Sequence, residues 1–306
     1  MQNLISGRSR LGLALSLLTV FLWGVLAIAL KIVLQAIDPF TVTWFRFSIA
    51  GLLLGIYLTV TQQLPSWQQL RKVSLPIFGV AVAGLALNYI LFLIGLGKTS
   101  PNNAQIITQI APVIMGMASL IIFKEKYNYR QWAGVSILIL GLMLFSHEQV
   151  RSLVNTFDTY FLGNVILIVG AIAWAFYGLA QKWLLKELPS SSVMLGIYLS
   201  AALLFAPFAA PLKVLSLSSL HLSLLIFCAL NTLIAYGAFA AALEHWQASR
   251  VSAVITLAPL VTLATSAIVP IFATQLLPPS PLSFWGWCGA IAVISGSMLI
   301  SLGNRK

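Results

Sequence analysis

The 306-residue chain is 60% hydrophobic and only 8% charged, and its mean hydropathy is +0.98. A soluble domain carries roughly 25% charged residues, so this composition excludes a soluble globular protein and indicates that lipid is the solvent. The formal net charge of +11 would suit a nucleic-acid partner in a soluble protein. Here the basic residues lie between apolar runs, which predicts a lipid bilayer as partner and no nucleic acid.

Apolar runs of about 20 residues recur along the chain, and each is long enough to cross a hydrocarbon core of about 30 Å. Lipid cannot satisfy free backbone groups and alternating strand patterns are absent, so the predicted spans are helices. The sequence therefore predicts an all-α integral membrane protein with ten transmembrane helices, near residues 11–35, 40–61, 75–97, 101–123, 130–146, 160–185, 191–212, 220–243, 249–273 and 282–302.

The loop charges predict the orientation of these spans. With a cytoplasmic N-terminus, the outer loops hold three basic residues, Lys98, Arg151 and Lys213. The inner side then holds twelve: Arg8, Arg10, Arg71, Lys72, Lys124, Lys126, Arg130, Lys182, Lys186, Arg250, Arg305 and Lys306. Short loops rich in Lys and Arg stay in the cytoplasm. We therefore expect a multi-pass protein of the inner membrane with both termini cytoplasmic.

The two halves of the chain repeat one another. Tyr89, Phe92, Leu96 and Ala111-Pro112 recur 147 residues later as Tyr236, Phe239, Leu243 and Ala258-Pro259. Trp23 and Lys31 recur 151 residues later as Trp174 and Lys182. The duplication predicts one five-helix unit at 1–150 and a second at 151–306. Because each unit has an odd number of spans, the two should face opposite ways, an arrangement typical of secondary transporters with a shared midplane site. A duplication kept only for packing is the alternative.

Several short motifs carry a family resemblance. They are Trp23-Gly24 followed by Lys31, then Arg46-Phe47, Asn88-Tyr89, the polar turn before Ala111-Pro112, and Phe123-Lys124-Glu125. Together they resemble the EamA-type branch of the drug/metabolite transporter superfamily. The resemblance implies ten helices, alternating access and a central cavity. Related members export amino acids, other metabolites or drugs. In the second half the place of Glu125 is taken by FATQLLPPSP, which has no acid. If Glu125 closes one gate, the opposite gate must be built differently.

Charged groups inside predicted spans are costly, so each is a candidate site residue. Arg46 lies about a turn and a half into the second span. It can either contact a substrate or extend to the headgroups and pair with Asp38. Lys31 is shallower, which favours extension to the headgroups, and we also consider it a gating residue together with Glu125.

Polar and aromatic side chains form stripes at helical spacing in several spans. Since amides facing lipid are costly, these stripes should point into the bundle. The expected substrate-binding residues are Trp23, Arg46, Asn88, Tyr89, Gln105, Gln109, Trp174, Tyr177, Gln181, Asn231 and Tyr236. For any single residue an interhelical hydrogen bond is the alternative. Pro112 and Pro259 each remove a helical hydrogen bond and predict helix breaks.

All six acidic residues fall at span ends or in loops. A proton relay or a site for cationic drugs usually needs an acid inside the membrane. Basic groups with several aromatic rings instead suit a carboxylate on an apolar body. We therefore expect a transporter, not an enzyme, for a small-molecule substrate such as a neutral or aromatic amino acid, without cofactor or metal. A proton-coupled multidrug exporter, a membrane-embedded enzyme and a channel are the alternatives. The sequence leaves the oligomeric state open, with a monomer as one option.

Overall fold

A computed structural model of the chain describes residues 8–125, 127–145, 159–272 and 283–302, and in these ranges it contains helices and no strands. The first half contains α1 (Ser9–Val33), α2 (Pro39–Val60), α3 (Trp67–Leu70), α4 (Leu75–Lys98), α5 (Pro101–Ile107), α6 (Ile110–Ile122) and α7 (Tyr129–Phe145). The second contains α9 (Thr159–Leu184), α10 (Ser190–Phe205), the 3-10 turn η1 (Ala206–Phe208), α11 (Leu212–Leu215), α12 (Ser219–His245), α13 (Ala248–Ile255), α14 (Ala258–Phe272) and α15 (Phe284–Leu302).

Eight candidate membrane spans among the described residues are long and apolar enough to cross a bilayer. Two of them, Pro101–Ile122 and Ala248–Val269, each combine two consecutive helices. The remaining apolar helices, α7 and α15, are shorter and lie at the positions of the fifth and tenth predicted spans. By length and composition the structure thus supplies eight of the ten expected spans.

Local sequence explains where the spans begin. Asp38 accepts a hydrogen bond from the Thr41 backbone N–H at 3.0 Å, and Pro39 follows it at the first helical position of α2. Ser100 and Pro101 start α5 in the same way. A side-chain acceptor satisfies an amide that has no helical partner, and proline has no such amide to satisfy. Polar turns between apolar runs therefore become short connections between antiparallel helices.

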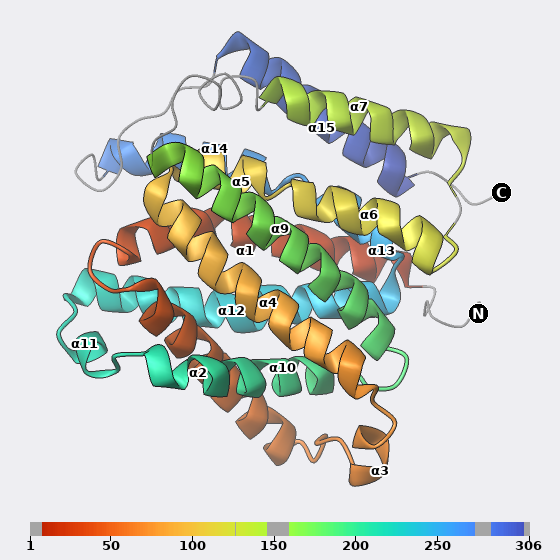
Figure 1. Cartoon of the computed structure of the whole chain (residues 1–306). Helices are drawn as coiled ribbons and strands as arrows, with labels where there is room; N and C mark the ends of the chain where they lie inside the picture. The colour runs from red at the N-terminus through yellow and green to blue at the C-terminus, as the bar shows by residue number, and fades with distance from the viewer. Residues whose placement is uncertain (1–7, 126, 146–158, 273–282, 303–306) are drawn as a thin grey trace.

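Long helices from the two halves pack against each other in matched pairs. Helix α1 packs on α12, and α4 packs on α9, which lies beside it in Figure 1. Since α1 matches α9 in sequence and α4 matches α12, these two pairs are equivalent. Helix α2 packs on α10, and α7 packs on α15 at the top of the view. The turn between α1 and α2 and helix α11 lie at the left, which we call the Asp38 end. The turn after α6 lies at the right, which we call the Glu125 end.

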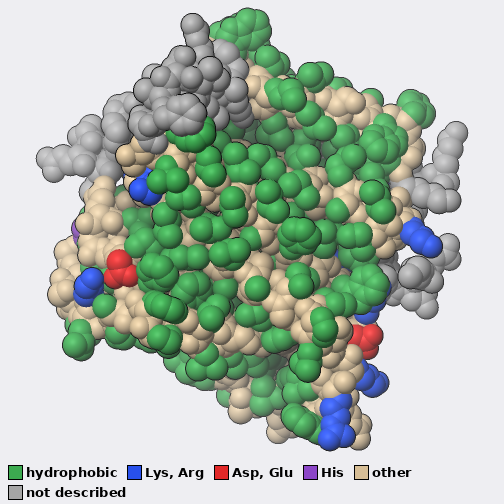
Figure 2. Space-filling model, viewed as in Figure 1, with side chains coloured by type: hydrophobic (Ala, Val, Ile, Leu, Met, Phe, Trp, Pro, Cys, Tyr) green, Lys and Arg blue, Asp and Glu red, His purple; other side chains and the backbone are tan. Residues whose placement is uncertain are grey.

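The surface in view is mainly apolar. In Figure 2 hydrophobic side chains cover most of the middle, whereas the charged side chains gather toward the left and lower right margins. Leu203 is 76% exposed and Ile121 is 81% exposed. Soluble proteins rarely expose large continuous apolar patches to water. This distribution is typical of a bundle whose flanks contact lipid.

The α4–α9 pair depends on a glycine at its crossing point. A Cβ atom on Gly84 would lie 2.8 Å from the Ala173 carbonyl oxygen and 3.0 Å from the Tyr177 amide nitrogen, both backbone atoms that cannot move aside. We expect Gly84→Ala to lower the free energy of unfolding by about 1–3 kcal/mol, since the helices must separate. Thermal unfolding in detergent would measure this.

Gly79 provides a matched control on the same helix. A Cβ atom there meets nothing within 4 Å, so Gly79→Ala should leave the melting temperature unchanged or raise it through better helix propensity. Equal losses of stability in both variants would contradict the close-contact explanation.

Candidate functional site

A cavity of about 90 Å³ lies at the centre of the bundle. Each buried water needs roughly 10–15 Å³ of such space, so the cavity has room for several waters or a small polar group. Its walls come from seven spans, with Trp23, Leu26, Ala27, Leu30, Arg46, Asn88, Tyr89, Phe92, Gln105, Thr108, Gln109, Ala111, Pro112, Trp174, Tyr236, Ile255 and Ala258 as the lining residues. The cavity extends from the middle of α1 toward the Asp38 end.

The structure brings most of the expected site residues together and leaves others apart. The lining includes Trp23, Arg46, Asn88, Tyr89, Gln105, Gln109, Trp174, Tyr236 and Pro112. Tyr177, Gln181, Asn231, Pro259, Lys31 and Glu125 do not line it. Phe92 and Thr108 do line it and were not selected from the sequence. Phe92 belongs to the repeated Tyr-x-x-Phe pattern, and Thr108 shares a helical face with Gln105 and Pro112. The sequence therefore contained a pattern that could have identified each of them.

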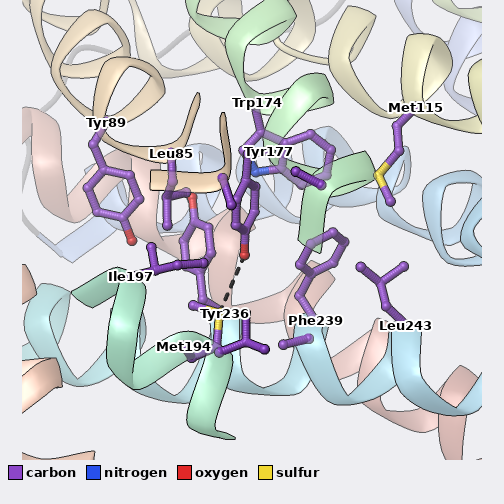
Figure 3. Packing of buried hydrophobic residues seen from close by; sticks show 14 of the residues in the cluster. Leu85, Tyr89, Met115, Trp174, Tyr177, Met194, Ile197, Tyr236, Phe239 and Leu243 are labelled. Carbon is purple, nitrogen blue, oxygen red and sulfur yellow. Dashed lines mark hydrogen bonds between the residues drawn. The ribbon is translucent and has the colours of Figure 1, made fainter. Parts of the chain in front are cut away.

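Aromatic rings close the cavity on the side of the Glu125 end. The ring centroids of Trp23 and Trp174, the tryptophans that recur in the two halves, lie 5.6 Å apart in an edge contact. Tyr236 lies 4.9 Å from Trp23 and 5.3 Å from Tyr89. Figure 3 shows that Tyr177, Phe239, Leu243 and Met115 continue this cluster beyond Trp174. The cavity therefore has an aromatic floor, and apolar packing separates it from the Glu125 end.

Arg46 is the charged group of the cavity. It is 2% exposed, and its guanidinium carbon lies 4.4 Å from the centre of the Tyr89 ring. Its Nε donates a hydrogen bond to Thr232 Oγ1 on α12 at 2.9 Å. Among the cavity-lining residues none is acidic. A ring and a hydroxyl stabilise a cation only partly, so the site holds a buried positive charge without a carboxylate partner.

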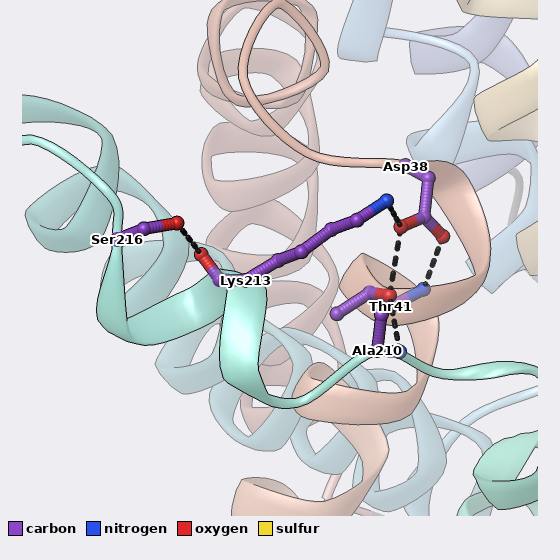
Figure 4. Close-up of polar contacts among 5 residues, drawn as sticks. All are labelled: Asp38, Thr41, Ala210, Lys213 and Ser216. Carbon is purple, nitrogen blue, oxygen red and sulfur yellow. Dashed lines mark hydrogen bonds and ion pairs between the residues drawn. The ribbon is translucent and has the colours of Figure 1, made fainter.

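The alternative pairing of Arg46 with Asp38 is wrong. Asp38 Oδ1 caps α2, Oδ2 accepts from Thr41 Oγ1 at 2.9 Å, and Lys213 lies 3.5 Å from Oδ2 (Figure 4). Arg46 lies eight positions after Asp38, about 12 Å along the helix axis, and it points inward to α12. Burial would raise the pKa of Asp38, but the hydrogen bonds from Thr41 and the charge of Lys213 outweigh it and lower that pKa.

Three buried polar atoms of lining residues have no hydrogen-bond partner among the described residues. They are Trp23 Nε1, a donor, Gln109 Oε1, an acceptor, and the Tyr89 hydroxyl, which can do both. An unpaired buried polar group is costly, and such groups in proteins usually bind water or a ligand. With Arg46 they give the cavity three kinds of donor, an indole, a hydroxyl and a guanidinium, and two kinds of acceptor, an amide oxygen and a hydroxyl.

Both proline-containing spans break beside the cavity. Helix α5 ends at Ile107 and α6 begins at Ile110, two residues before Pro112. Helix α13 ends at Ile255 and α14 begins at Ala258, next to Pro259. Each proline lacks the N–H that would continue the helical hydrogen bonds. The residues at the bends, Thr108 and Gln109 in one half and Ile255 in the other, line the cavity, although Pro259 does not.

Asparagines in the paired helices form the interhelical bonds that were the alternative to substrate binding. Asn88 Nδ2 donates to the Gly170 carbonyl at 3.0 Å and still lines the cavity. Asn231 Nδ2 donates to the Leu22 carbonyl at 2.7 Å, away from it. Tyr177 points to Met194 Sδ at 3.6 Å instead of the cavity. Gln181 lies deeper on α9 and is fully buried. The polar stripe on α9 is thus longer than the cavity.

The recurring lysines bind helix C-termini. Lys31 Nζ donates to the carbonyls of Leu96, Gly97 and Thr99 at the end of α4, at 2.8, 3.1 and 2.7 Å. Lys182 Nζ donates to the carbonyls of Leu243 and Trp246 at the end of α12. Free carbonyls at a helix C-terminus attract a cation. Lys31 is therefore half-buried against the end of α4. Its extension to the headgroups stays a prediction.

Glu125 joins the two halves at its own end of the bundle. Its carboxylate accepts hydrogen bonds from the backbone N–H groups of Ala248 at 3.0 Å and Ser249 at 3.2 Å, and from the Ser249 hydroxyl. These amides form the N-terminus of α13, where a negative charge is stabilised. Ser119 Oγ adds a bond from α6 at 3.1 Å.

The profile of the EamA-like transporter family matches this chain twice, at residues 10–147 and 161–302. The chain belongs to the EamA-like transporter family. This EamA-like chain is thus a multi-span membrane transporter. It is 38% identical to an uncharacterized inner membrane transporter, YhbE, of Escherichia coli K12, over 96% of this chain and 92% of that protein. A transporter of Haemophilus influenzae is 36% identical over 96% of both chains.

Two more distant likenesses add context to the family assignment. A protein of Escherichia coli K12 named a probable amino-acid metabolite efflux pump is 22% identical over 95% of both chains. A solved crystal structure shares 16% identity with this EamA-like chain, with a TM-score of 0.68, over 96% of this chain and 99% of that one. That similarity supports the fold alone.

Proposed function

We propose that this protein is a secondary transporter of small carboxylate metabolites, with neutral or aromatic amino acids as the substrate class, and that it acts as an exporter or facilitator by alternating access. The observation that carries the proposal is Arg46, a buried cation in the central cavity with no acidic lining residue beside it. An incoming carboxylate supplies the missing charge, and a guanidinium binds carboxylates with two parallel hydrogen bonds.

The surrounding groups suit the rest of an amino acid. Rings of Trp23, Trp174 and Tyr236 offer an apolar and aromatic wall. An ammonium group finds the acceptor Oε1 of Gln109, and cation–π contact with a tryptophan face adds to its binding. At about 90 Å³ the cavity is small for an aromatic amino acid, so we expect it to widen when such a substrate binds.

Alternating access rests on the duplication. We infer two inverted five-helix repeats in the inner membrane with cytoplasmic termini. The equivalent pairs α1–α12 and α4–α9, and the equivalent bonds of Lys31 and Lys182, support this inference. Glu125 closes one end, and its counterpart in the second half lies outside the described residues. If the two ends are closed by different contacts, the outward-open and inward-open states would differ in stability.

The direct test of the proposal is counterflow in proteoliposomes. Vesicles loaded with one unlabelled compound from a panel of amino acids, organic acids, sugars and nucleosides would be diluted into labelled compound of the same kind. We expect exchange for neutral or aromatic amino acids and none for sugars or nucleosides. Exchange confined to compounds without a carboxylate would contradict the proposal.

A proton-coupled multidrug exporter is the rival within transport, and it predicts a different response to pH. Because no acidic residue is among the described residues that line the cavity, we expect amino-acid exchange at equal concentrations to change less than about twofold when a gradient of one pH unit is imposed. Accumulation against a concentration gradient driven by that pH difference would favour the rival.

A further inference from the structure

A second concave site lies at the Asp38 end, away from the central cavity. It is an open groove of about 470 Å³ between the α1–α2 turn, the last turns of α4 and helix α11. One wall is apolar, and its partly exposed side chains are Leu34 and Ile94. Lys98 and Lys213 stand at its rim with Asp38. The groove thus combines an apolar wall that continues along a membrane span with a cationic rim.

The charges at this rim are not balanced. Lys213 pairs with Asp38 at 3.5 Å, with side-chain exposures of 60% and 32%. The Lys98 ammonium makes no hydrogen bond or ion pair with the residues that the structure describes. Only three basic residues were expected in the outer loops, and two of them, Lys98 and Lys213, meet at this groove. The groove therefore carries a net positive charge on an otherwise weakly charged face.

Neighbouring side chains place the rim at headgroup depth. Lys213 belongs to α11, where Leu212 is 80% exposed and Leu215 is 84% exposed. Large apolar side chains this exposed next to a lysine are typical of a segment lying at the boundary between headgroups and acyl chains. Figure 4 shows the Lys213 side chain extending from α11 toward Asp38 at the start of α2.

We propose that this groove binds an anionic phospholipid, with the headgroup phosphate between Lys98 and Lys213 and an acyl chain along Leu34 and Ile94. A basic rim beside an apolar wall complements both parts of such a lipid. The bound lipid would span the α1–α2 turn, α4 and α11. This site is independent of the transported substrate and of the proposed function.

The test uses native mass spectrometry of the full chain released from detergent with added phosphatidylglycerol, or with phosphatidylcholine of the same acyl chains. We expect tighter retention of phosphatidylglycerol, and about fivefold weaker retention for each lysine neutralised in Lys98→Gln and in Lys98→Gln with Lys213→Gln. Lys98→Gln removes no hydrogen bond or ion pair among the described residues, so its folding should be unaffected.

The matched control is Arg71→Gln with Lys72→Gln, which removes the same charge from the exposed connection between α3 and α4. The control should retain phosphatidylglycerol as the parent protein does. Equal losses in the control, equal retention of phosphatidylcholine, or displacement of the lipid by water-soluble glycerol phosphate would each overturn the proposal.

Discussion

Replacing Arg46 with alanine is expected to weaken substrate binding by about 10- to 150-fold. The estimate follows from the loss of a hydrogen-bonded charge pair, which contributes about 1.5–3 kcal/mol. The guanidinium is the only cation among the cavity-lining residues. The half-saturation concentration for counterflow in proteoliposomes, and ligand-induced thermal shifts of the purified protein, would measure the change.

Two further variants separate the charge of Arg46 from its structural contacts. Arg46→Lys keeps the charge but loses the planar contact with Tyr89 and the two-pronged geometry, so it should restore binding only in part. Thr232→Val removes the hydroxyl that accepts from Arg46 and leaves the guanidinium in place. Thr232→Val should weaken substrate binding less than Arg46→Ala does. If Arg46→Ala transported with unchanged half-saturation, the carboxylate assignment would be wrong.

Glu125→Ala is expected to open the end of the bundle at which this carboxylate joins the two halves. The variant loses three hydrogen bonds to the start of α13. Since bonds to a charged group contribute about 1.5–3 kcal/mol each, loss of even one shifts the balance between closed and open states by about tenfold or more. We expect lower net flux, because a transporter must close one end before it opens the other.

Thiol labelling would measure the opening. Ser252 is 1% exposed and lines a small space between α6 and α13, near Ser249. In a background with Cys228→Ala and Cys288→Ala, Ser252→Cys should react at least about tenfold faster with a water-soluble thiol reagent when Glu125 is alanine. Glu187→Ala removes an exposed carboxylate at the same end and should leave the rate unchanged. An unchanged rate in Glu125→Ala would count against the closure.

The repeat predicted much of the geometry because equivalent residues in two copies occupy equivalent places. It matched Trp23 with Trp174 as candidate binding residues and predicted helix breaks beside both prolines. In the structure the two rings are in contact, and the helices break at 107–110 and 255–258. Composition predicted membrane-spanning helices because a chain with only 8% charged residues suits lipid and not water as its solvent. These features depend on local patterns, which a single sequence contains.

Contacts that depend on how distant helices pack were not predictable. The sequence did not reveal that Lys31 binds the end of α4, since 65 residues separate it from Leu96. It suggested Asp38 for Arg46 because the two are close in sequence, whereas the partner is Thr232, 186 residues away. The depth of the cavity was also hidden. Gln181 shares a helical face with Trp174, but the cavity ends at the aromatic rings and does not reach Gln181.

The central claim is that Arg46 recognises a carboxylate, and a pair of ligands that differ only there tests it most directly. Counterflow of an aromatic amino acid would be compared with that of its C-terminal amide in the same proteoliposomes. We predict that the free acid exchanges at least about tenfold faster than the amide, and that Arg46→Ala removes the difference. Equal exchange of acid and amide by the parent protein would contradict the account.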